Sequence, residues 1–356
     1  MKTFKKVLNY IFVDGMAGMA LGLFGTLIIG TILAQIASFI PGAVGVFAAR
    51  SAAVIKALTG AGIGVGVAYK FKDKTLVALS AAGAGMVGAF ASQIIKGSVL
   101  TEKGALLLSG PGEPLGAFIA VMVAVSLGRL VAGKTKIDIL VTPFVSIVSG
   151  SIVGLLVGPP ISSFMKWLGA LVNWGAERQP VLMGIVVAVI MGMILTLPIS
   201  SAALGIMLNL SGLAAGAAVI GCSAQMVGFA VASFRENRWG GLFAQGLGTS
   251  MLQVPNIMKR PVIWLPPIIA SAILGPIGTA ALHMTCNAVG SGMGTSGLVG
   301  QIMSFQTLTE GGLSAGLALA EILAFHVILP AALTLLISEG MRKIGWIRSG
   351  DMKLDL

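Results

Sequence analysis

Apolar segments follow one another along almost the whole chain, and most are long enough to cross a lipid bilayer. A helical crossing needs about 20 predominantly apolar residues. The clearest segments of this kind are 15–40, 75–95, 114–133, 138–158, 180–200, 213–234, 262–283 and 313–337. The pattern predicts an all-α, polytopic integral membrane protein.

Two further apolar segments carry charged or aromatic interruptions. Arg50 and Lys56 interrupt residues 42–69, so we expect only part of that segment to enter the bilayer. Residues 159–178 carry Lys166, Trp167, Trp174, Glu177 and Arg178, a mixture typical of an amphipathic segment at the membrane interface. Proline and glycine break other stretches before they reach spanning length.

The broken stretches 198–212 and 242–257 are apolar but too short to span, and they favour re-entrant hairpins or half-helices. Counting the clear and interrupted segments together, we expect about nine or ten crossings. With no polar region between them, residues 1–356 are predicted to form a single membrane-embedded domain.

Composition strengthens the membrane prediction. Hydrophobic residues make up 56% of the chain and charged residues only 10%, against about 25% charged residues in ordinary soluble domains. The 50 glycines suit helices that approach one another closely in a bilayer. The net charge of +11 comes from basic clusters between apolar segments, which favours loop charges that set topology over nucleic-acid binding.

The basic clusters also predict an orientation, because lysine and arginine are enriched in cytoplasmic loops. The first apolar segment has no clear cleavage site and is expected to remain as a helix. Both termini are predicted to be cytoplasmic on the basis of Lys2, Lys5, Lys6, Lys70, Lys72, Lys74, Lys134, Lys136, Arg342, Lys343, Arg348 and Lys353. The pairs Arg235/Arg238 and Lys259/Arg260 have no assigned side.

Several chemistries have no support in the sequence. It contains no phosphate-binding P-loop motif, no metal-spaced His/Cys cluster and no CxxC pair. His283 and His326 are the only histidines, and neither belongs to a recognisable Ser/His/Asp arrangement. We therefore predict no catalytic residue, metal or cofactor in this chain, and whether it counts as an enzyme subunit stays open. Any chemistry on a solute would come from a partner.

Two short patterns each occur twice. Pro160-Ile-Ser-Ser163 returns as Pro198-Ile-Ser-Ser201, and Gly246-Leu-Gly-Thr-Ser250 returns as Gly292-Met-Gly-Thr-Ser296. Chance is one explanation in a glycine-rich chain. The other is that both patterns mark helix breaks, which at membrane depth line cavities and in transporters build substrate sites.

Neutral polar side chains gather near the second pair of breaks, within 245–256 and 287–301. Amides and hydroxyls on irregular backbone suit an uncharged sugar or polyol. The residues predicted to bind it are Thr249, Ser250, Gln253, Asn256, Thr295 and Ser296. The alternative is that these groups only satisfy one another between helices.

Two carboxylates add to this set. Glu113 lies in a Pro/Gly turn before an apolar segment, where it could accept hydrogen bonds from a hydroxylated ligand, or simply sit in a surface loop. Glu321 lies about 12 Å into the last apolar segment and is a proton- or ion-site candidate, or a helix–helix contact. His326 follows five residues later, about 500° around an α-helix, so we expect no shared face with Glu321. Pro330 is expected to kink this helix.

Several strings together resemble the membrane IIC proteins of the bacterial phosphotransferase system, in the branch often labelled perfringolysin-regulator-like. The resemblance is strongest over 110–310. The matching strings are Thr135-Lys-Ile-Asp-Ile-Leu-Val-Thr-Pro143, Gly158-Pro-Pro-Ile-Ser-Ser-Phe164, Leu197-Pro-Ile-Ser-Ser201, Phe229 to Asn237, Gly246 to Asn256 and Gly290 to Gln301.

The resemblance implies a sugar permease component, usually a homodimer in the bacterial inner membrane. A separate IIB protein, phosphorylated through a IIA protein, would phosphorylate the sugar. IIC proteins contact sugar through a carboxylate on a re-entrant turn and a histidine. Glu113 suits the first role, whereas neither histidine lies in a comparable turn. The alternatives to this IIC-like permease are an ion-gradient-driven transporter or channel that uses Glu321, and a membrane sensor without net transport.

Overall fold

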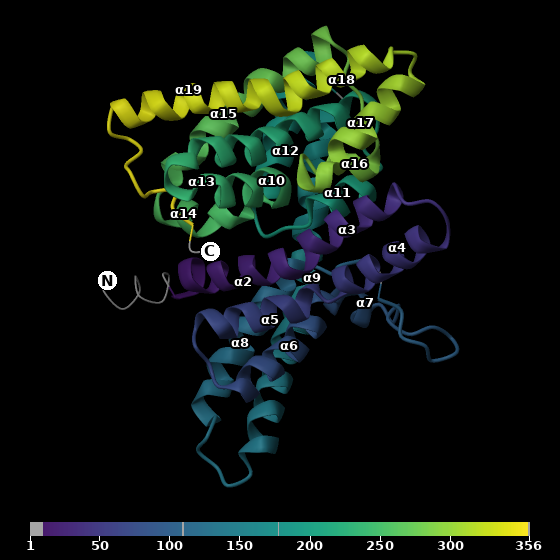
Figure 1. The fold of residues 1–356 in the computed structure, drawn as a ribbon. Helices are drawn as coiled ribbons and strands as arrows, with labels where there is room; N and C mark the ends of the chain where they lie inside the picture. Colours follow the sequence, from purple (N-terminus) through teal and green to yellow (C-terminus); the bar gives the residue numbers. More distant parts are fainter. Residues whose placement is uncertain (1–9, 109, 177, 355–356) are drawn as a thin grey trace. The chain divides into compact units, whose positions relative to one another are not determined.

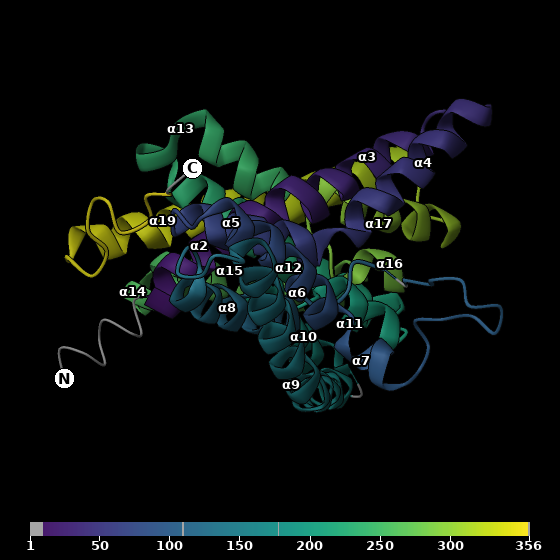
Figure 2. The ribbon, with the colours of Figure 1, turned by 90° about the horizontal axis from the view of Figure 1, so that it is seen from below.

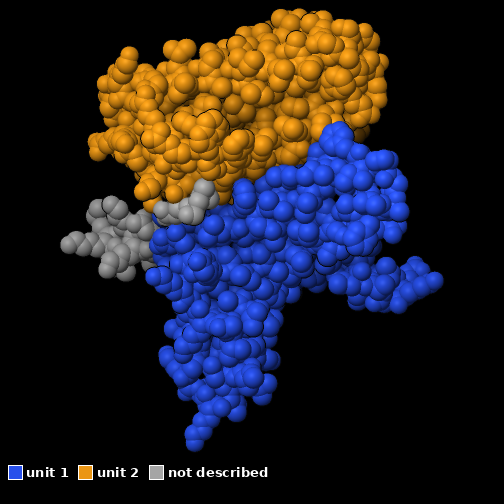
Figure 3. Space-filling model, in the orientation of Figure 1, with its two compact units in different colours: residues 1–165, 356 blue, residues 166–355 orange. Residues whose placement is uncertain are grey.

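The computed structural model describes residues 10–108, 110–176 and 178–354. Over these residues the chain is helical, and its only β-type pairings are two isolated bridges, Leu100 with Leu106 and Gly212 with Cys286. The all-α prediction is confirmed. The helices form two compact units, residues 1–165 (unit 1) and residues 166–355 (unit 2), which Figure 3 colours separately.

Unit 1 begins with one helical segment that contains two π-type turns, and continues through two broken helices to two long ones (Figure 1). Its elements are η1 (Tyr10–Gly15), α2 (Met16–Leu23), η2 (Phe24–Ile28), α3 (Ile29–Ser38), α4 (Gly42–Ala57), α5 (Thr59–Lys70), α6 (Thr75–Ala89), α7 (Ala91–Ile95), α8 (Pro114–Val131) and the first part of α9 (Asp138–Ala176).

Glycine allows the helices of unit 1 to pack at backbone contact. A Cβ atom on Gly22 of α2 would lie 2.2 Å from the carbonyl oxygen of Gly62 in α5. A Cβ on Gly60 of α5 would lie 2.5 Å from the Gly85 carbonyl oxygen in α6. Figures 1 and 2 show α2, α5, α6 and α8 side by side. Small residues at these contacts are the usual way in which membrane helices approach closely.

One end of unit 1 is tied together around Arg129. Its guanidinium pairs with Asp73, donates to the Tyr10 hydroxyl at 2.9 Å, and lies 4.7 Å from the centre of the Phe71 ring. Nearby, Lys74 Nζ donates to the Ala132 carbonyl oxygen at 3.0 Å. The loops at 70–74 and 132–138 therefore lie at the same end, as the charge pattern predicts. Lys2, Lys5 and Lys6 lie outside the described residues.

Unit 2 contains three long helices joined by short, irregular helical pieces (Figure 1). Its elements are the end of α9, α10 (Pro180–Thr196), α11 (Ser201–Met207), α12 (Gly212–Ala232), α13 (Phe234–Phe243), η3 (Ala244–Gly248), η4 (Ser250–Gln253), α14 (Val254–Lys259), η5 (Pro261–Trp264), α15 (Leu265–Pro276), η6 (Ile277–Ala281), α16 (Ala288–Ser291), η7 (Ser296–Leu298), α17 (Val299–Glu310), α18 (Ala315–Leu323), η8 (Ala324–Ile328) and α19 (Leu329–Lys343).

Helix α12 is the centre of unit 2, because α10, α15 and α19 all pack against it. Seventeen of its residues are buried, including the whole run from Ala215 to Ala230. The contact with α10 again depends on glycine, since a Cβ on Gly221 would lie 1.9 Å from the Ala188 carbonyl oxygen. Polar side chains on α12 therefore have to find their partners within the protein.

Within the described residues, six helical segments are long and apolar enough to cross a membrane, or seven if the bent pair α4–α5 counts as one span. They are Val13–Ser38, Pro114–Val131, Asp138–Ile161, Gly212–Ala232, Pro261–Ala281 and Ala315–Lys343. We expected nine or ten crossings, and nine are reached only if the shorter apolar helices α6 and α10 also cross. The stretches 198–212 and 242–257 form half-helices and short turns, none of spanning length.

The predicted span 138–158 closely matches Asp138–Ile161, the part of α9 that is apolar enough to cross a membrane, although the helix does not end there. Helix α9 continues through Pro143, Pro159 and Pro160 and ends only at Ala176. Membrane helices tolerate internal proline because neighbouring groups satisfy the carbonyls that proline leaves unpaired. The amphipathic character predicted for 159–178 is seen in Trp167 and Trp174, which are both exposed on the last part of this helix.

Candidate functional site

The centre of unit 2 contains a small polar cluster built around Gln225 of α12. The Oε1 atom of Gln225 accepts hydrogen bonds from the Trp264 indole at 2.9 Å and from the Thr196 hydroxyl at 3.3 Å. The Thr196 and Ser250 hydroxyls lie 2.8 Å apart. We call Thr196, Gln225, Ser250 and Trp264 the Gln225 cluster.

Irregular backbone brings the cluster together. Thr196 is the last residue of α10, where Leu197 turns to an extended conformation before Pro198. Ser250 follows the extended residue Thr249, and Trp264 ends the short turn before α15. Ser250 lies within the predicted break 242–257, and Thr196 lies at the end of α10, two residues before the predicted break 198–212.

The cluster leaves one strong donor without a partner. Because the Trp264 indole can only donate, the Gln225 atom that it contacts is Oε1, and the NH2 group of the amide points away from the indole. Gln225 is fully buried, and among the described residues its Nε2 has no hydrogen-bond partner. A buried amide without a partner carries an unfavourable free energy that a bound hydroxyl could remove.

Gln253 and Asn256, two of the predicted solute ligands, bind the C-terminal segment instead. Gln253 Nε2 donates to the Met352 carbonyl oxygen at 3.0 Å, and Asn256 Nδ2 donates to the Lys353 carbonyl oxygen at 2.9 Å. Gln253 also donates to Gln245 Oε1 and accepts from Asn256, both at 2.9 Å. The alternative interpretation, in which polar groups satisfy one another, thus describes these two amides.

Thr249, Thr295 and Ser296 hold the irregular backbone in place. The Thr249 hydroxyl accepts from the Met251 amide at 3.2 Å, and the Thr295 hydroxyl donates to the Gly246 carbonyl oxygen. Ser296 is buried at the start of η7. The two copies of the Gly-x-Gly-Thr-Ser pattern therefore contact each other.

The second proline pattern joins the same region, because the Ser201 hydroxyl donates to the Gly292 carbonyl oxygen at 2.7 Å. Gly292 itself has no room for a side chain, since a Cβ there would lie 2.2 Å from the Ser201 carbonyl oxygen. Helix α11 is thereby fixed to α16, and the repeated patterns mark the contacts between the broken segments of unit 2.

Glu113 lies in unit 1, at the junction of a broken helix and a long one. Its backbone N–H donates to the Ala89 carbonyl oxygen at 2.8 Å, where α6 ends. Gly112 has a φ of +74°, and a Cβ there would lie 2.7 Å from the Ala89 methyl group. The turn is therefore docked onto the break between α6 and α7, and Glu113 immediately precedes Pro114 of α8. The non-helical turn predicted before this apolar segment is thus present.

Glu321 and His326 lie on the last spanning segment, which contains a π-type turn between them. Leu329 N–H donates to the Ala324 carbonyl oxygen, five residues back, so a widened turn at η8 directly precedes Pro330. An α-helical angle of 100° per residue therefore does not apply between Glu321 and His326. The Oε2 atom of Glu321 is buried without a hydrogen-bond partner among the described residues.

Within the described part of the chain, no group of His, Cys, Asp and Glu residues could hold a metal ion. Cys222 and Cys286 are free, buried thiols.

A family model described as "Phosphotransferase system, EIIC" matches residues 13–354. The chain belongs to this EIIC family. It is a membrane transport component of the phosphotransferase system.

The family match extends the resemblance seen over 110–310 to almost the whole EIIC chain. No curated protein sequence matches it.

Three members of the Gln225 cluster, namely Thr196, Gln225 and Trp264, were not predicted from the sequence. Gln225 is the one amide within an apolar span, 213–234, which is a usable signal. Trp264 and Thr196 occupy the ends of apolar segments, where tryptophan and threonine are too common to be informative.

Proposed function

We propose that this EIIC protein binds and translocates a sugar or polyol, which separate IIA and IIB proteins phosphorylate. The fixed, unpartnered NH2 group of Gln225 is the observation that carries the proposal. The hydroxyl oxygens of a sugar accept hydrogen bonds from such a donor, and the Thr196 and Ser250 hydroxyls can donate or accept. The cluster has no charge, which suits an uncharged solute.

The predicted site residues enter this proposal to different degrees. Ser250 belongs to the Gln225 cluster, and Thr249, Thr295 and Ser296 hold the backbone around it. Glu113, in unit 1, is proposed by itself as a solute contact that accepts a charge-assisted hydrogen bond from a hydroxyl. Gln253 and Asn256 can contact the solute only when the C-terminal segment leaves them.

A panel of common hexoses, hexitols and pentitols tests binding. Purified protein in detergent is heated with each compound, and a bound solute raises the midpoint of unfolding because it stabilises the folded state. We expect at least one sugar or polyol to raise the midpoint in a concentration-dependent way. If none does while an unrelated EIIC protein responds to its own sugar under the same conditions, the proposal fails.

Coupling is tested by uptake of the compound that the panel identifies. In cells with an intact phosphoenolpyruvate relay we expect phosphorylated solute to accumulate, and in cells without the relay no accumulation. The alternative, an ion-driven transporter, is favoured by the buried Oε2 of Glu321, which lacks a partner among the described residues. Uptake that survives loss of the relay but stops with a protonophore would favour that alternative.

We further propose a homodimer in the bacterial inner membrane with both termini in the cytoplasm. Ion pairs support a common end for the basic segments of unit 2, since Arg260 pairs with Asp351 at 3.3 Å and Arg342 with Glu236 at 2.9 Å. Positive charge favours the cytoplasmic side for that end. A cysteine at position 353 that reacts with an impermeant maleimide in intact spheroplasts would contradict this orientation.

A further inference from the structure

The C-terminal segment, which we define as residues 346–354, turns back from the end of α19 and docks beside α13 and α14 (Figure 1). Ile347 and Met352 are buried in a hydrophobic cluster that also contains Phe229 of α12 and Met341 of α19. Burial of two large apolar side chains stabilises the docked position of so short a segment. The segment is therefore part of the interior of unit 2 and not a loose extension of it.

Side chains of α13 hold the main chain of the segment. Asn237 Nδ2 donates to the Met352 carbonyl oxygen at 2.8 Å, and Asn237 Oδ1 accepts from the Leu354 N–H at 2.8 Å. The Gly350 N–H donates to the Glu236 carboxylate at 3.4 Å. These contacts lie on both sides of Met352, so the segment cannot slide along α13 without losing several hydrogen bonds at once.

Two buried amides divide their NH2 groups between the segment and a neighbouring amide. Gln253 Nε2 donates to the Met352 carbonyl oxygen at 3.0 Å and to Gln245 Oε1 at 2.9 Å. Asn256 Nδ2 donates to the Lys353 carbonyl oxygen and to Gln253 Oε1, both at 2.9 Å. Withdrawal of the segment would leave one buried N–H of each amide without its partner, which is unfavourable.

Gln253 ends the same short turn that Ser250 begins. The turn η4 consists only of residues 250–253, and at about 2 Å per residue its two ends lie roughly 6 Å apart. The position of Gln253 therefore largely determines that of Ser250, whose hydroxyl lies 2.8 Å from the Thr196 hydroxyl in the Gln225 cluster. The buried amides thus connect the segment with one member of that cluster.

A second connection leads to Trp264, another member of the cluster. Arg260, which directly precedes η5, lies 3.3 Å from the Asp351 carboxylate and donates to the Trp346 carbonyl oxygen at 3.2 Å. Trp264 ends η5, and its side chain packs against the hydrophobic cluster that contains Met352. The segment therefore contacts η5 at its start through Arg260 and at its end through apolar packing.

We propose that residues 346–354 are a positioning element of the Gln225 cluster. One connection runs through η4 to Ser250, and the other runs through η5 to Trp264. The Trp264 indole sets the orientation of the Gln225 amide, so the segment also sets where the NH2 group of that amide points. This inference deepens the proposed function and rests on it only for the role of the cluster as the solute site.

Hydrogen exchange of the Trp264 indole tests the proposal without any solute. In ¹⁵N-tryptophan-labelled protein in detergent, the five tryptophans give separate indole signals, and Trp264→Phe identifies one of them. Met352→Ala removes a buried anchor of the segment, and we expect the indole N–H to exchange with D2O about tenfold faster because η5 opens more often. Met258→Ala makes the same change at an exposed side chain of α14 and should exchange as the wild type does.

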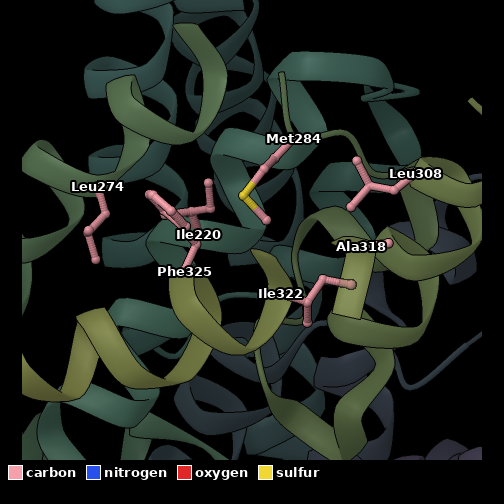
Figure 4. Packing of buried hydrophobic residues seen from close by; sticks show 7 residues of the cluster. All are labelled: Ile220, Leu274, Met284, Leu308, Ala318, Ile322 and Phe325. Atoms are coloured by element: carbon pink, nitrogen blue, oxygen red, sulfur yellow. The ribbon is translucent and has the colours of Figure 1, made fainter. Parts of the chain in front are cut away.

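A further variant separates positioning from a general loss of stability. Ile322 packs with Ile220 and Phe325 in a different hydrophobic cluster, which contains no residue of the segment (Figure 4). Ile322→Ala also leaves a cavity in unit 2 and should lower the unfolding midpoint as Met352→Ala does. We expect the Trp264 indole of Ile322→Ala to exchange at nearly the wild-type rate. Equal acceleration by both variants would mean that the segment only stabilises unit 2 in general, and would overturn the proposal.

A milder variant covers the case in which Met352→Ala does not fold. Asp351→Asn keeps an acceptor for the Arg348 N–H but loses the charge that attracts Arg260. Because this pair is partly exposed, we expect only about threefold faster exchange of the Trp264 indole. Wild-type exchange in Met352→Ala, or in Asp351→Asn where Met352→Ala does not fold, overturns the proposal. A solute panel without any binder would instead end the proposed function and leave this result standing.

Discussion

Unit 1 and unit 2 both place a short apolar helix before a break and a long buried helix after it. In unit 1 these are α6, the break at Phe90 and α8. In unit 2 they are α10, the break at 197–200 and α12. The long helix packs against the short one in each case. What differs is the polar chemistry that each unit buries around this arrangement.

Among the described residues of unit 1, the polar residues that are buried as a whole carry hydroxyls, namely Thr31, Thr59, Ser80, Thr142 and Ser146. Such hydroxyls can bond to their own helix, as Ser80 does to the Leu76 carbonyl oxygen at 2.6 Å. The Asp73 side chain is also buried, at 3% exposed, and pairs with Arg129 at one end of the unit. Unit 2 buries the amides of Gln225, Gln245, Gln253 and Asn256 and the imidazole of His326. These larger groups need partners from other elements. Unit 2 therefore has specific polar contacts in its interior, whereas the contacts of Arg129 in unit 1 lie at one end, where that side chain is exposed at 33%.

The largest effect should come from breaking the most buried ion pair. Arg342 and Glu236 are exposed at only 11% and 6%, whereas Arg129 beside Asp73 in unit 1 is exposed at 33%. Removing one partner of a buried pair typically costs about 3–5 kcal/mol. We expect Arg342→Met to lower the unfolding midpoint in detergent more than Arg129→Met does. The reverse order would show that unit 1 holds the more important polar contact.

A smaller effect is expected at Glu113, the carboxylate of unit 1. Loss of a hydrogen bond to a charged group costs about 1.5–3 kcal/mol, or roughly a 10- to 150-fold loss of affinity. Glu113→Ala should therefore lower uptake of the panel's sugar or polyol at subsaturating concentration. The control is Glu102→Ala, at an exposed carboxylate in the preceding hairpin. Equal uptake by both variants would show that Glu113 takes no part in solute recognition.

The glycine contacts should behave alike in the two units, because they depend on backbone approach and not on polar chemistry. Gly60→Ala in unit 1 and Gly221→Ala in unit 2 each force a methyl group against a carbonyl oxygen, and each should cost about 1–3 kcal/mol. Gly316→Ala, which meets no atom within 4 Å, should have little effect. A large loss of stability in one unit only would show that close backbone packing does not stabilise the two units in the same way.

The smallest effect is expected at the exposed pair between Arg235 and Glu339, which lie 3.0 Å apart with Arg235 exposed at 70%. Exposed pairs contribute at most about 1 kcal/mol. We expect Arg235→Gln to shift the unfolding midpoint only slightly, and less still in high salt. A shift as large as that of Arg342→Met would mean that burial does not explain the difference in stabilisation between the two ion pairs.

The membrane spans could be predicted because an uninterrupted apolar segment of spanning length, such as 114–133, is rarely found outside a membrane. The broken stretches could be predicted because proline and glycine interrupt them. The course of α9 through Pro159 and Pro160 could not, since neighbouring helices decide whether proline ends a membrane helix. The relation of Glu321 to His326 was hidden by the π-type turn, which has no clear sequence signature.

The site was predictable only in part, for a physical reason. Ser250 was found because polar residues on broken helices stand out. Gln253 and Asn256 have the same appearance, but their partners, Met352 and Lys353, lie almost 100 residues away. A local pattern does not reveal which amides a distant segment will occupy. For Gln225 the decisive fact is that the Trp264 indole sets the orientation of its amide, which only the fold can show.

The central claim is that unit 2 recognises the solute through the Gln225 amide. Its most direct test is the dissociation constant of the panel's sugar or polyol for Gln225→Leu, measured beside Gln306→Leu, whose amide is exposed and bonded to Glu310. Two lost hydrogen bonds of about 1 kcal/mol each predict at least a tenfold weaker affinity for Gln225→Leu. Gln306→Leu should bind as the wild type does. Equal affinity of both variants would contradict the account.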